Sequence, residues 1–310
     1  VSNYRRICQK AGAPVMAIIK ADAYGHGTEP CVRALLDAGC DFFAVSCIEE
    51  ALEVRTVCRD KKMDADILIL GYTPPEAVKV LHQHNVSQCV FSPDYARSLA
   101  EAARLAGVSV KAHIKGDTGM GRLGFLLRHE EDLLRCSDEI AVSLADSALV
   151  AEGIFTHFAN ADGDEDYTML QFTRFLDTLD ELEKRYSLTF EIRHCAASAA
   201  VLNYPCTHLD MVRPGLIQYG MMPSAFMQTM LPLSPVMSLK TNVSLVKCVP
   251  AGETVSYGRT YTAELDTRVA TVAIGYADGY ARRCSNRGHM LLSGVPAPVI
   301  GRVCMDQCML

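Results

Sequence analysis

The feature that most constrains the fold is a regular alternation of short apolar runs with amphipathic helical stretches, from Val15 to about Pro214. This alternation is typical of βα units. The helical stretches carry their apolar residues on one face, as in "TMLQFTRFLDTLDELEKRY" at 168–186, which indicates packing against a sheet. The eight predicted strands are 15–20, 42–45, 66–70, 88–91, 108–115, 152–156, 190–194 and 211–213.

Eight strands, each followed by a helix, predict an α/β fold of the (β/α)8 TIM-like barrel type. A doubly wound open sheet is the alternative, but no G-x-G-x-x-G follows an early strand, so a dinucleotide site has no support. After "SPVMSLK" the chain changes to long alternating stretches with Gly, Pro, Asn and Ser breaks, which predict a mostly-β domain. We therefore predict a barrel over 1–225 and a β-domain over 226–310.

The charge and the apolar pattern of the sequence bear on whether the protein binds nucleic acid or crosses a membrane. The formal net charge is −6 and no basic run is present, so we expect no nucleic-acid partner. No apolar run has the length of a membrane span, and the first ten residues suit an amphipathic helix better than a signal peptide. We expect a cytoplasmic protein, or the cytosolic domain of a membrane-anchored protein if a membrane segment precedes Val1.

The thirteen cysteines are scattered and include no C-x-x-C pair, which predicts reduced thiols rather than a disulfide framework. The closest pairs of metal-ligand types are Cys304 with Cys308 and His82 with His84. Neither pair has further ligands at matching spacing. We predict no metal, and interpret the pairs as core thiols and a solvated helix end.

Reactive side chains follow several predicted strands. In a barrel the carboxyl ends of the strands meet at one mouth, where the chemistry lies. Strand eight lies beside strand one in a closed barrel, so Arg213 is expected close to Lys20. Each residue taken singly could have a non-catalytic role, as a solvated lysine, a salt-bridged arginine or a core histidine. Their meeting at one end of the barrel favours a functional site. The mouth residues are Lys20, Tyr24, Lys115, Arg122, His157, Ser198, Arg213 and Gly215.

This set suggests imine formation with an aldehyde that carries a phosphate. A lysine amine becomes nucleophilic where burial or nearby cations lower its pKa. The hydroxyls of Ser198 and Tyr24 and the N–H groups of Gly215 and Leu216 are suited to a phosphate. An aldehyde and a phosphate on one aromatic ring indicate pyridoxal 5′-phosphate.

Seven motifs along the chain resemble those of the PLP-dependent alanine racemases, and the resemblance runs essentially from end to end. The family consists of homodimers of a barrel plus a β-domain, and includes the alanine/serine racemase domain of vancomycin-resistance type membrane enzymes. The motifs occur in family order: "AIIKADAYGHG", "KGDTGMGRLG", "THFANAD", "VRPGLIQYG", "VSYGRTYTA", "IGYADGY" and "GRVCMDQ".

The resemblance implies two bases on opposite faces of the substrate. Lys20 matches the lysine that anchors the cofactor and acts as one base, and Tyr257 matches the second base, which comes from the partner subunit. Arg213 matches the arginine that faces the pyridine nitrogen, and His157 matches a histidine packed beside it. A guanidinium stays protonated there and leaves the ring a weaker electron sink.

The remaining implied roles concern the substrate. Arg122 matches an arginine near the cofactor's phenolic oxygen and the substrate carboxylate, and Lys115 matches a lysine that several members carry as a carbamate. Met305 and Asp306 match residues of the partner subunit at the substrate carboxylate. Family members continue beyond Leu310 with a further pocket tyrosine, so we expect a fragment with an incomplete β-domain.

The implied function is interconversion of L- and D-alanine, which supplies D-alanine for peptidoglycan. A serine racemase domain of a membrane-anchored enzyme is the nearest alternative. A non-catalytic PLP carrier is the alternative from another class, but such carriers lack a β-domain. A basic amino-acid decarboxylase is disfavoured by Arg213, because those enzymes place an acidic residue at the pyridine nitrogen.

Overall fold

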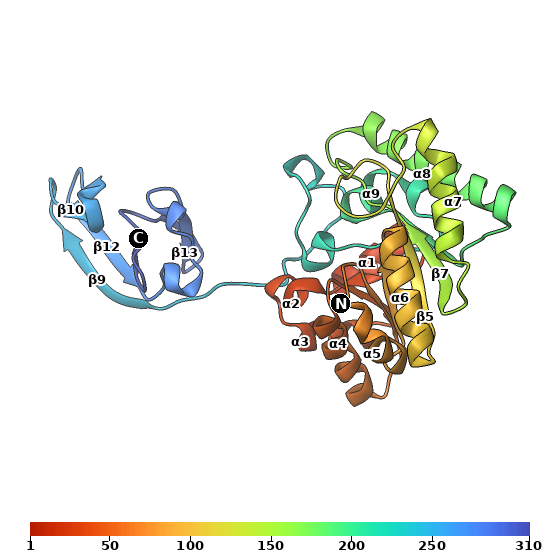
Figure 1. Cartoon of the computed structure of the whole chain (residues 1–310). Helices are drawn as coiled ribbons and strands as arrows, with labels where there is room; N and C mark the ends of the chain where they lie inside the picture. The colour runs from red at the N-terminus through yellow and green to blue at the C-terminus, as the bar shows by residue number, and fades with distance from the viewer. The chain divides into compact units, whose positions relative to one another are not determined.

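The computed structural model describes residues 1–310, except for the side chain of Glu130. It divides into two compact units, Val1–Met237 and Ser238–Leu310, which Figure 1 shows in red to cyan and in blue. The predicted boundary at 225/226 lies within the segment that ends the first unit. Residues 226–237 stay with that unit because Met227 and Leu231 are buried in its core, and Asn3 donates a hydrogen bond to the Ser234 carbonyl.

The first unit alternates strands and helices in the predicted order. Its strands are β1 (Ala17–Ile18), β2 (Phe42–Val45), β3 (Asp66–Ile69), β4 (Val86–Val90), β5 (Val110–Asp117), β6 (Phe125–Leu126), β7 (Leu149–Phe155) and β8 (Ile192–His194). Its helices are α1 (Ser2–Ala11), α2 (Lys20–Gly25), α3 (Thr28–Leu36), α4 (Ile48–Lys61), α5 (Val78–Gln83), α6 (Pro93–Ala106), α7 (Glu130–Ser143), α8 (Glu165–Tyr186) and α9 (Ser198–Asn203).

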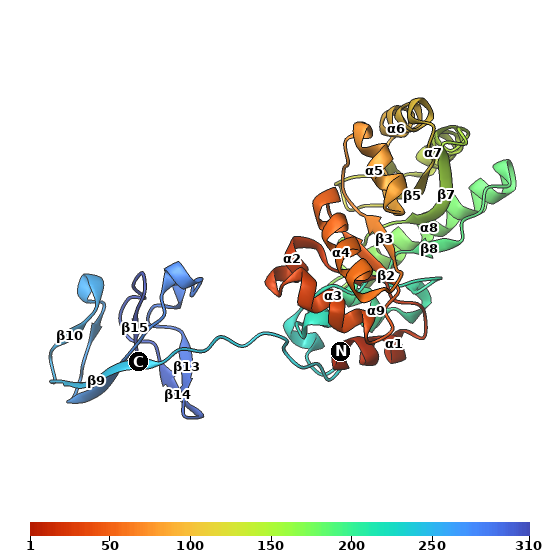
Figure 2. The same cartoon turned by 90° about the horizontal axis from the view of Figure 1, so that it is seen from below.

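These strands form one curled parallel sheet. Its strand order is β1-β2-β3-β4-β5-β7-β8, and the short strand β6 lies outside this order and pairs with β5. The helices lie around the outer side of the sheet (Figure 2). The predicted strand 211–213 appears as two single parallel bridges, Val15 to Val212 and Ala197 to Arg213. These bridges join the last and first strands, so the predicted barrel-type α/β fold is confirmed, with a shorter eighth strand than expected.

Alternation along the strands produces two layers of core. Phe43 and Ile67 belong to the larger apolar cluster between the sheet and the helices. Phe42 and Leu68 belong to a smaller apolar cluster inside the barrel. The part of the interior near β5, β7 and β8 is polar instead and holds His113, Glu152 and His194.

A left-handed turn follows β1. Within α2 the residues from Ala21 to Tyr24 have φ between 51° and 59° and ψ between 34° and 54°. None is glycine, and this conformation costs L-residues about 1–2 kcal/mol each. The turn ends at Gly25 and Gly27, which have φ of 78° and 90°, as expected for residues that redirect the backbone into the next helix.

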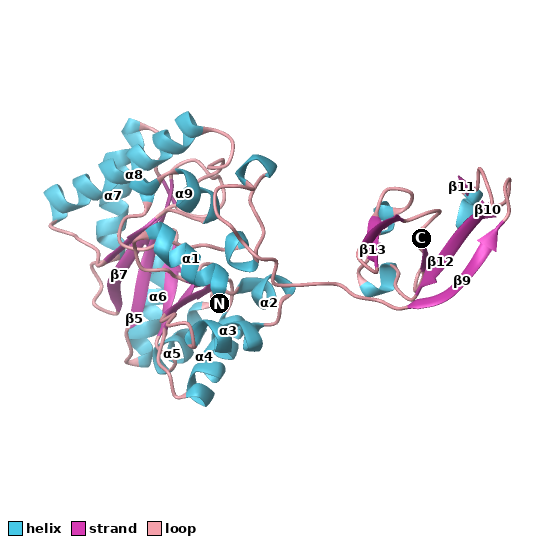
Figure 3. Cartoon of the chain, turned by 180° about the vertical axis from the view of Figure 1, so that it is seen from behind, coloured by secondary structure: helices cyan, strands magenta, loops and turns pink.

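The second unit is mostly β, as predicted. Its three-stranded sheet has the order β15-β12-β9, and two hairpins accompany it. Figure 3 shows the strands of this unit in magenta, with β9 to β13 labelled. Tyr257 lies in a short 3-10 turn, Tyr257–Arg259, between the strands of the first hairpin. The strands are β9 (Val243–Val249), β10 (Thr254–Val255), β11 (Tyr261–Thr262), β12 (Thr267–Val272), β13 (His289–Leu292), β14 (Val295–Pro298) and β15 (Cys308–Met309).

The described residues contain neither a membrane-spanning helix nor a cluster of metal-ligand side chains. Among them, no helix combines the length and the apolar character that a membrane crossing needs. Within the same part of the chain, no cluster of three or more His, Cys, Asp or Glu side chains is arranged to hold a metal ion. The thirteen cysteines are free thiols.

Candidate functional site

A cavity of about 520 Å³ opens at the carboxyl ends of the barrel strands. It is lined by all the residues that the sequence predicted for the barrel mouth, so the fold brings together side chains from five different strand ends. The predicted site residues among its lining are Lys20, Tyr24, Lys115, Arg122, His157, Ser198, Arg213, Gly215 and Leu216.

Lys20 lies where β1 ends and the left-handed turn begins. Burial lowers the pKa of its amine, and the positive charges of Arg122 and Arg213 lower it further, while the negative charge of Glu50 opposes this. A lowered pKa leaves more of the amine in its neutral, nucleophilic form. The position and the surrounding charges therefore suit an amine that attacks a carbonyl.

Tyr24 and Gly215 are in close contact. A Cβ on residue 215 would lie 2.4 Å from the Tyr24 hydroxyl oxygen, so only glycine leaves space for this approach. The N–H of Gly215 donates to the Ser198 hydroxyl at 3.0 Å. The Tyr24 ring also packs against Tyr219, with 5.0 Å between ring centroids. Together these groups form a cluster of uncharged hydrogen-bonding groups at one end of the cavity.

Arg213 is 3% exposed and lies in the wall of the same cavity. Its guanidinium donates to Nδ1 of His194 at 2.7 Å and to the carbonyl of Thr156 at 2.7 Å. Burial lowers the pKa of Arg213 to about 10, so the group stays charged at neutral pH. A charged donor fixed in this way can hydrogen-bond to a ligand nitrogen without giving up its proton.

A buried chain of hydrogen bonds continues from Arg213 through the polar part of the barrel interior. His194 Nε2 lies 2.9 Å from His113 Nδ1, and His113 Nε2 lies 2.9 Å from a carboxylate oxygen of Glu152. Arginine can only donate, so we assign His194 as the Nε2–H tautomer and His113 likewise. Each imidazole therefore accepts a hydrogen bond at Nδ1 and donates one from Nε2, and the Glu152 carboxylate accepts the last of these bonds.

Burial and neighbouring groups set the charge states of these hydrogen-bonded side chains. Burial lowers the pKa of His194 well below its usual range, and the charge of Arg213 adds to that effect. Although burial alone disfavours the Glu152 carboxylate, hydrogen bonds from His113, Ser87 and Lys111 lower its pKa to about 2. The chain thus holds a cation at one end and an anion at the other.

These hydrogen bonds were not predicted from the sequence. The predicted partner of Arg213 was His157, which lies in the same cavity lining, and the structure adds His194 in direct hydrogen-bond contact with Arg213. The available signal was position: His113, Glu152 and His194 are polar residues inside predicted apolar strands. Gly153 was another signal, because a Cβ there would lie 2.3 Å from His113 Nδ1.

His157 is a neutral group in the cavity wall. Burial lowers its pKa to about 3, with further contributions from Arg213 and the other cations around the cavity. Lys115 is 4% exposed, and its amine lies 5.6 Å from the centroid of the Phe155 ring. Burial lowers the Lys115 pKa, and the charges of Arg122 and Arg213 act in the same direction.

Arg122 is presented by a loop that Asp117 organises. The Asp117 carboxylate accepts the N–H groups of Gly119, Met120 and Gly121, and it pairs with Arg128 at 2.8 Å. Burial alone would raise the pKa of Asp117, but these hydrogen bonds outweigh it and lower the pKa. Sequence reasoning named neither Asp117 nor Arg128, although both flank the glycine-rich loop.

The other predicted site residues belong to the second unit. Tyr257 and Met305 are 72% and 58% exposed, and Asp306 is also exposed. Exposure leaves all three free for contacts beyond their own unit. Tyr280, in the motif "IGYADGY", packs against the apolar cluster of that unit.

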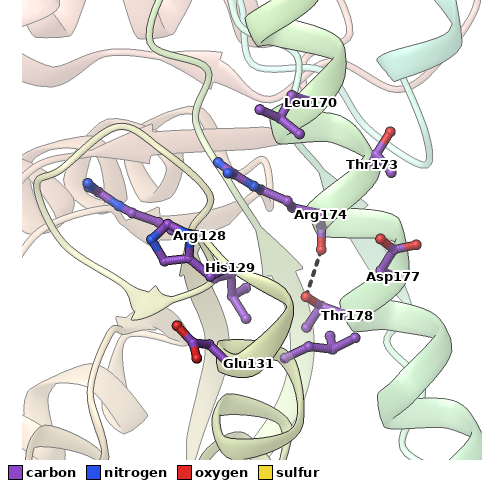
Figure 4. A pocket seen from close by; sticks show the side chains of 10 residues that line it. Arg128, His129, Glu131, Leu170, Thr173, Arg174, Asp177 and Thr178 are labelled. Carbon is purple, nitrogen blue, oxygen red and sulfur yellow. Dashed lines mark hydrogen bonds between the residues drawn. The ribbon is translucent and has the colours of Figure 1, made fainter.

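A second cavity, of about 640 Å³, lies between α7 and α8. Figure 4 shows Arg174 extending from α8 toward the side of the cavity where Arg128 lies, with Asp177 on α8 and Glu131 on α7 nearby. Arg174 donates to the Thr118 carbonyl at 2.8 Å, so both arginines brace the loop that carries Arg122. Of the described residues that line this cavity, none is a predicted site residue.

Two family models match the chain. Residues 1–223 match the "Alanine racemase, N-terminal domain", and residues 236–310 match the "Alanine racemase, C-terminal domain". The curated alanine racemase of Desulforamulus reducens is 44% identical over 297 residues, which are 95% of this chain and 78% of that protein.

Solved structures agree with this match. Alanine racemase from the D-cycloserine producer Streptomyces lavendulae superimposes with a TM-score of 0.88 at 35% identity, covering 99% of this chain and 79% of that one. Alanine racemase from Bacillus anthracis with bound L-Ala-P gives a TM-score of 0.81 at 33% identity, covering 99% and 79%. Sequence and fold therefore point to the same relatives.

Proposed function

Because this chain belongs to the alanine racemase family, we propose that it interconverts L- and D-alanine with pyridoxal 5′-phosphate bound in the Lys20 cavity. The observation that carries the proposal is the meeting of Lys20, Tyr24 and Arg213 in one cavity, at the positions that the family motifs assign to them. Production of D-alanine for peptidoglycan is the biological role that this activity would serve.

The residues present fit the cofactor. A lysine with a lowered pKa is suited to covalent attachment to the aldehyde, and the buried, charged Arg213 is suited to the ring nitrogen. The hydroxyls of Tyr24 and Ser198 and the backbone at Gly215 and Leu216 would hold the phosphate. The positive charges of Arg122 and Arg213 in the cavity lining also favour an anionic ligand.

Pyridoxal 5′-phosphate, when bound, supplies an electron-withdrawing ring that acidifies the α-proton of an attached amino acid. Lys20 would then move a proton at one face of the substrate Cα, and Tyr257 from a partner subunit would move one at the other face. Arg213 would donate a hydrogen bond to the ring nitrogen and keep its own proton, which would limit the ring's acidifying strength. Arg122 orients the substrate carboxylate through its planar pair of donors.

A homodimer with shared sites is part of the proposal. Tyr257, Met305 and Asp306 are exposed in their own unit, which supports a role at a neighbour's cavity. Met305 and Asp306 would lie at the substrate carboxylate. The lowered pKa of Lys115 supports a carbamate there, because carbon dioxide adds to neutral amines.

The alternatives receive less support. A non-catalytic PLP carrier would not need the second unit, which matches the family's C-terminal domain over 236–310. The serine racemase alternative is not favoured by the relatives, which are named alanine racemases at 40–44% identity. A cytoplasmic location is a further part of the proposal, supported by thirteen free cysteines.

The test is exchange of the alanine α-proton. The full-length protein loaded with pyridoxal 5′-phosphate is incubated in deuterated water with L-alanine, D-alanine or L-serine. The proposal expects loss of the α-proton signal and formation of the opposite enantiomer for alanine, at a higher rate than for serine. Absence of exchange with either alanine enantiomer would refute it.

A further inference from the structure

The left-handed turn after Lys20 is held by the carboxylate of Glu50. One oxygen accepts the N–H of Ala21 at 2.6 Å, and the other accepts the N–H and the hydroxyl of Ser46 at 2.7 and 2.9 Å. Ser46 directly follows β2 and lines the cavity. A single carboxylate therefore ties the residue after Lys20 to the end of the neighbouring strand.

This is more than the usual role of an acidic residue at the start of a helix. At the third position of a helix, a glutamate ordinarily turns back to the N–H of the capping residue, which in α4 is Cys47. Glu50 reaches past Cys47 to Ser46 and to a separate segment of chain. Its neighbour Glu49 lies in the same helical turn and is exposed, so the two glutamates form a natural matched pair.

Ser46 is fixed from its other side as well. A Cβ on Gly71, just after β3, would lie 2.3 Å from the Ser46 carbonyl oxygen. The Gly71 carbonyl in turn accepts a hydrogen bond from the Gln88 amide of β4 at 2.8 Å. Contacts thus run from β4 across the ends of β3 and β2 to the turn, with Glu50 as their last link.

The turn needs such support. Ala21 to Tyr24 all have positive φ without being glycine, a conformation that persists only where the surroundings enforce it. Lys20 and Tyr24 stand at its two ends, and both line the cavity. We propose that Glu50 is a positioning residue for Lys20: its carboxylate holds the turn in place, so that the Lys20 amine and the Tyr24 hydroxyl face the same ligand.

The charge of Glu50 has a second, separable effect on Lys20. The charged and titratable groups around that amine are Arg122, Arg213, His157 and Glu50. A nearby negative charge favours the ammonium form, and Glu50 acts in this direction against the two arginines. Loss of the Glu50 charge should therefore lower the Lys20 pKa further, and the neutral amine should appear at lower pH.

This inference rests on the proposed role of Lys20 as the anchor of the cofactor. The test therefore measures capture of pyridoxal 5′-phosphate by the full chain, separately from racemisation. The visible absorbance of the attached cofactor gives the affinity and the pH midpoint of capture, and borohydride reduction followed by peptide mass analysis verifies attachment at Lys20. The proteins are the wild type, Glu50→Gln, Glu50→Ala, Gly71→Ala and the control Glu49→Gln.

Each variant has a distinct expected result. Glu50→Ala loses both contacts and should bind the cofactor about tenfold or more weakly. Glu50→Gln keeps the side-chain volume and one acceptor, so it should lose less affinity but shift the capture midpoint to lower pH. Gly71→Ala disturbs Ser46 and keeps the charge, so it should weaken binding without that shift. Glu49→Gln should match the wild type in both measurements.

Two results would overturn the inference. The first is capture by both Glu50 variants with wild-type affinity and midpoint. The second is an equal loss of thermal stability in Glu49→Gln and Glu50→Gln with no change in midpoint, which would mean that Glu50 supports only its helix. If the wild type itself fails to capture the cofactor at Lys20, the proposed function fails first, and the inference fails with it.

Discussion

Arg213 and His194 form a buried hydrogen bond in which guanidinium Nη1 donates to imidazole Nδ1 at 2.7 Å. Both side chains are inaccessible or nearly so, with exposures of 3% and 0%. The bond fixes the tautomer of His194 and orients the guanidinium in the cavity wall. The direction of the Arg213 side chain therefore depends on a residue inside the barrel that does not itself line the cavity.

Replacement of His194 tests this dependence. In His194→Ala the buried guanidinium loses an acceptor, and we expect the full chain to lose about 1–3 kcal/mol of unfolding free energy. His194→Asn should lose less, because its amide oxygen can take the place of Nδ1. Urea unfolding followed by circular dichroism measures both. Equal stability of wild type and His194→Ala would contradict the structural role of this bond.

Glu152 predicts a pH dependence of stability. Its pKa is about 2 in the folded protein against 4.5 for the free side chain, so the ionised form is favoured by folding. This contribution, of the order of 3 kcal/mol at most, is fully present above pH 4.5 and is lost as the pH falls towards 2.

The matching variant is Glu152→Gln, which keeps the shape and an acceptor for His113. The stability difference between wild type and this variant should be largest near neutral pH and should shrink between pH 4.5 and 2. Unfolding curves recorded at several pH values measure that difference. A difference that does not change over this interval would mean that Glu152 is not the charged end of the chain.

Because Tyr24 and Gly215 are in contact, a substitution of one should partly offset the effect of a substitution of the other on cofactor binding. Gly215→Ala places a Cβ 2.4 Å from the Tyr24 hydroxyl oxygen, so the tyrosine must move and cofactor binding should weaken about tenfold or more. Removal of that oxygen in Gly215→Ala/Tyr24→Phe should recover part of the loss. Equilibrium binding of pyridoxal 5′-phosphate to the four proteins of this cycle measures the coupling. Strictly additive effects would show that the two residues do not compete for space.

Asp117 predicts a selective effect on substrate binding. Asp117→Ala removes the acceptor of three loop N–H groups and the partner of Arg128, so the loop that carries Arg122 should lose its fixed shape. We expect KM for alanine to rise about tenfold with a smaller change in kcat. Asp180→Asn, at an exposed pair on α8, is the control. A fall in kcat alone would contradict this role.

Most of the fold was predictable from the sequence because the spacing of apolar residues indicates which faces of the strands and helices are buried. Strands such as Phe42–Val45 lie where the apolar runs predicted them. The eighth strand was the exception: residues 211–213 make only single bridges, because Pro214 follows at once and has no N–H to continue a ladder. The chain's left-handed turn was also missed, since Ala, Asp and Tyr rarely adopt positive φ and nothing local signals it.

The candidate site was predictable where residues end strands and not where they lie inside them. Lys20 and Arg213 were found because a barrel collects its strand ends at one mouth. His113, Glu152 and His194 were missed because their partners are 19 to 81 residues away in sequence, and only the register of the sheet brings them together. Glu50 was missed for the same reason, since its link to Ala21 spans 29 residues.

Mixing two inactive variants tests directly whether a two-base site is shared between subunits. Lys20→Ala and Tyr257→Phe should each have little racemase activity as homodimers. After subunits of the two variants are mixed and exchanged, half of the dimers are hybrids, and each hybrid holds one intact site. We therefore expect recovery of about a quarter of the wild-type alanine racemisation rate. Hybrid dimers with no activity above that of the parent variants would contradict it.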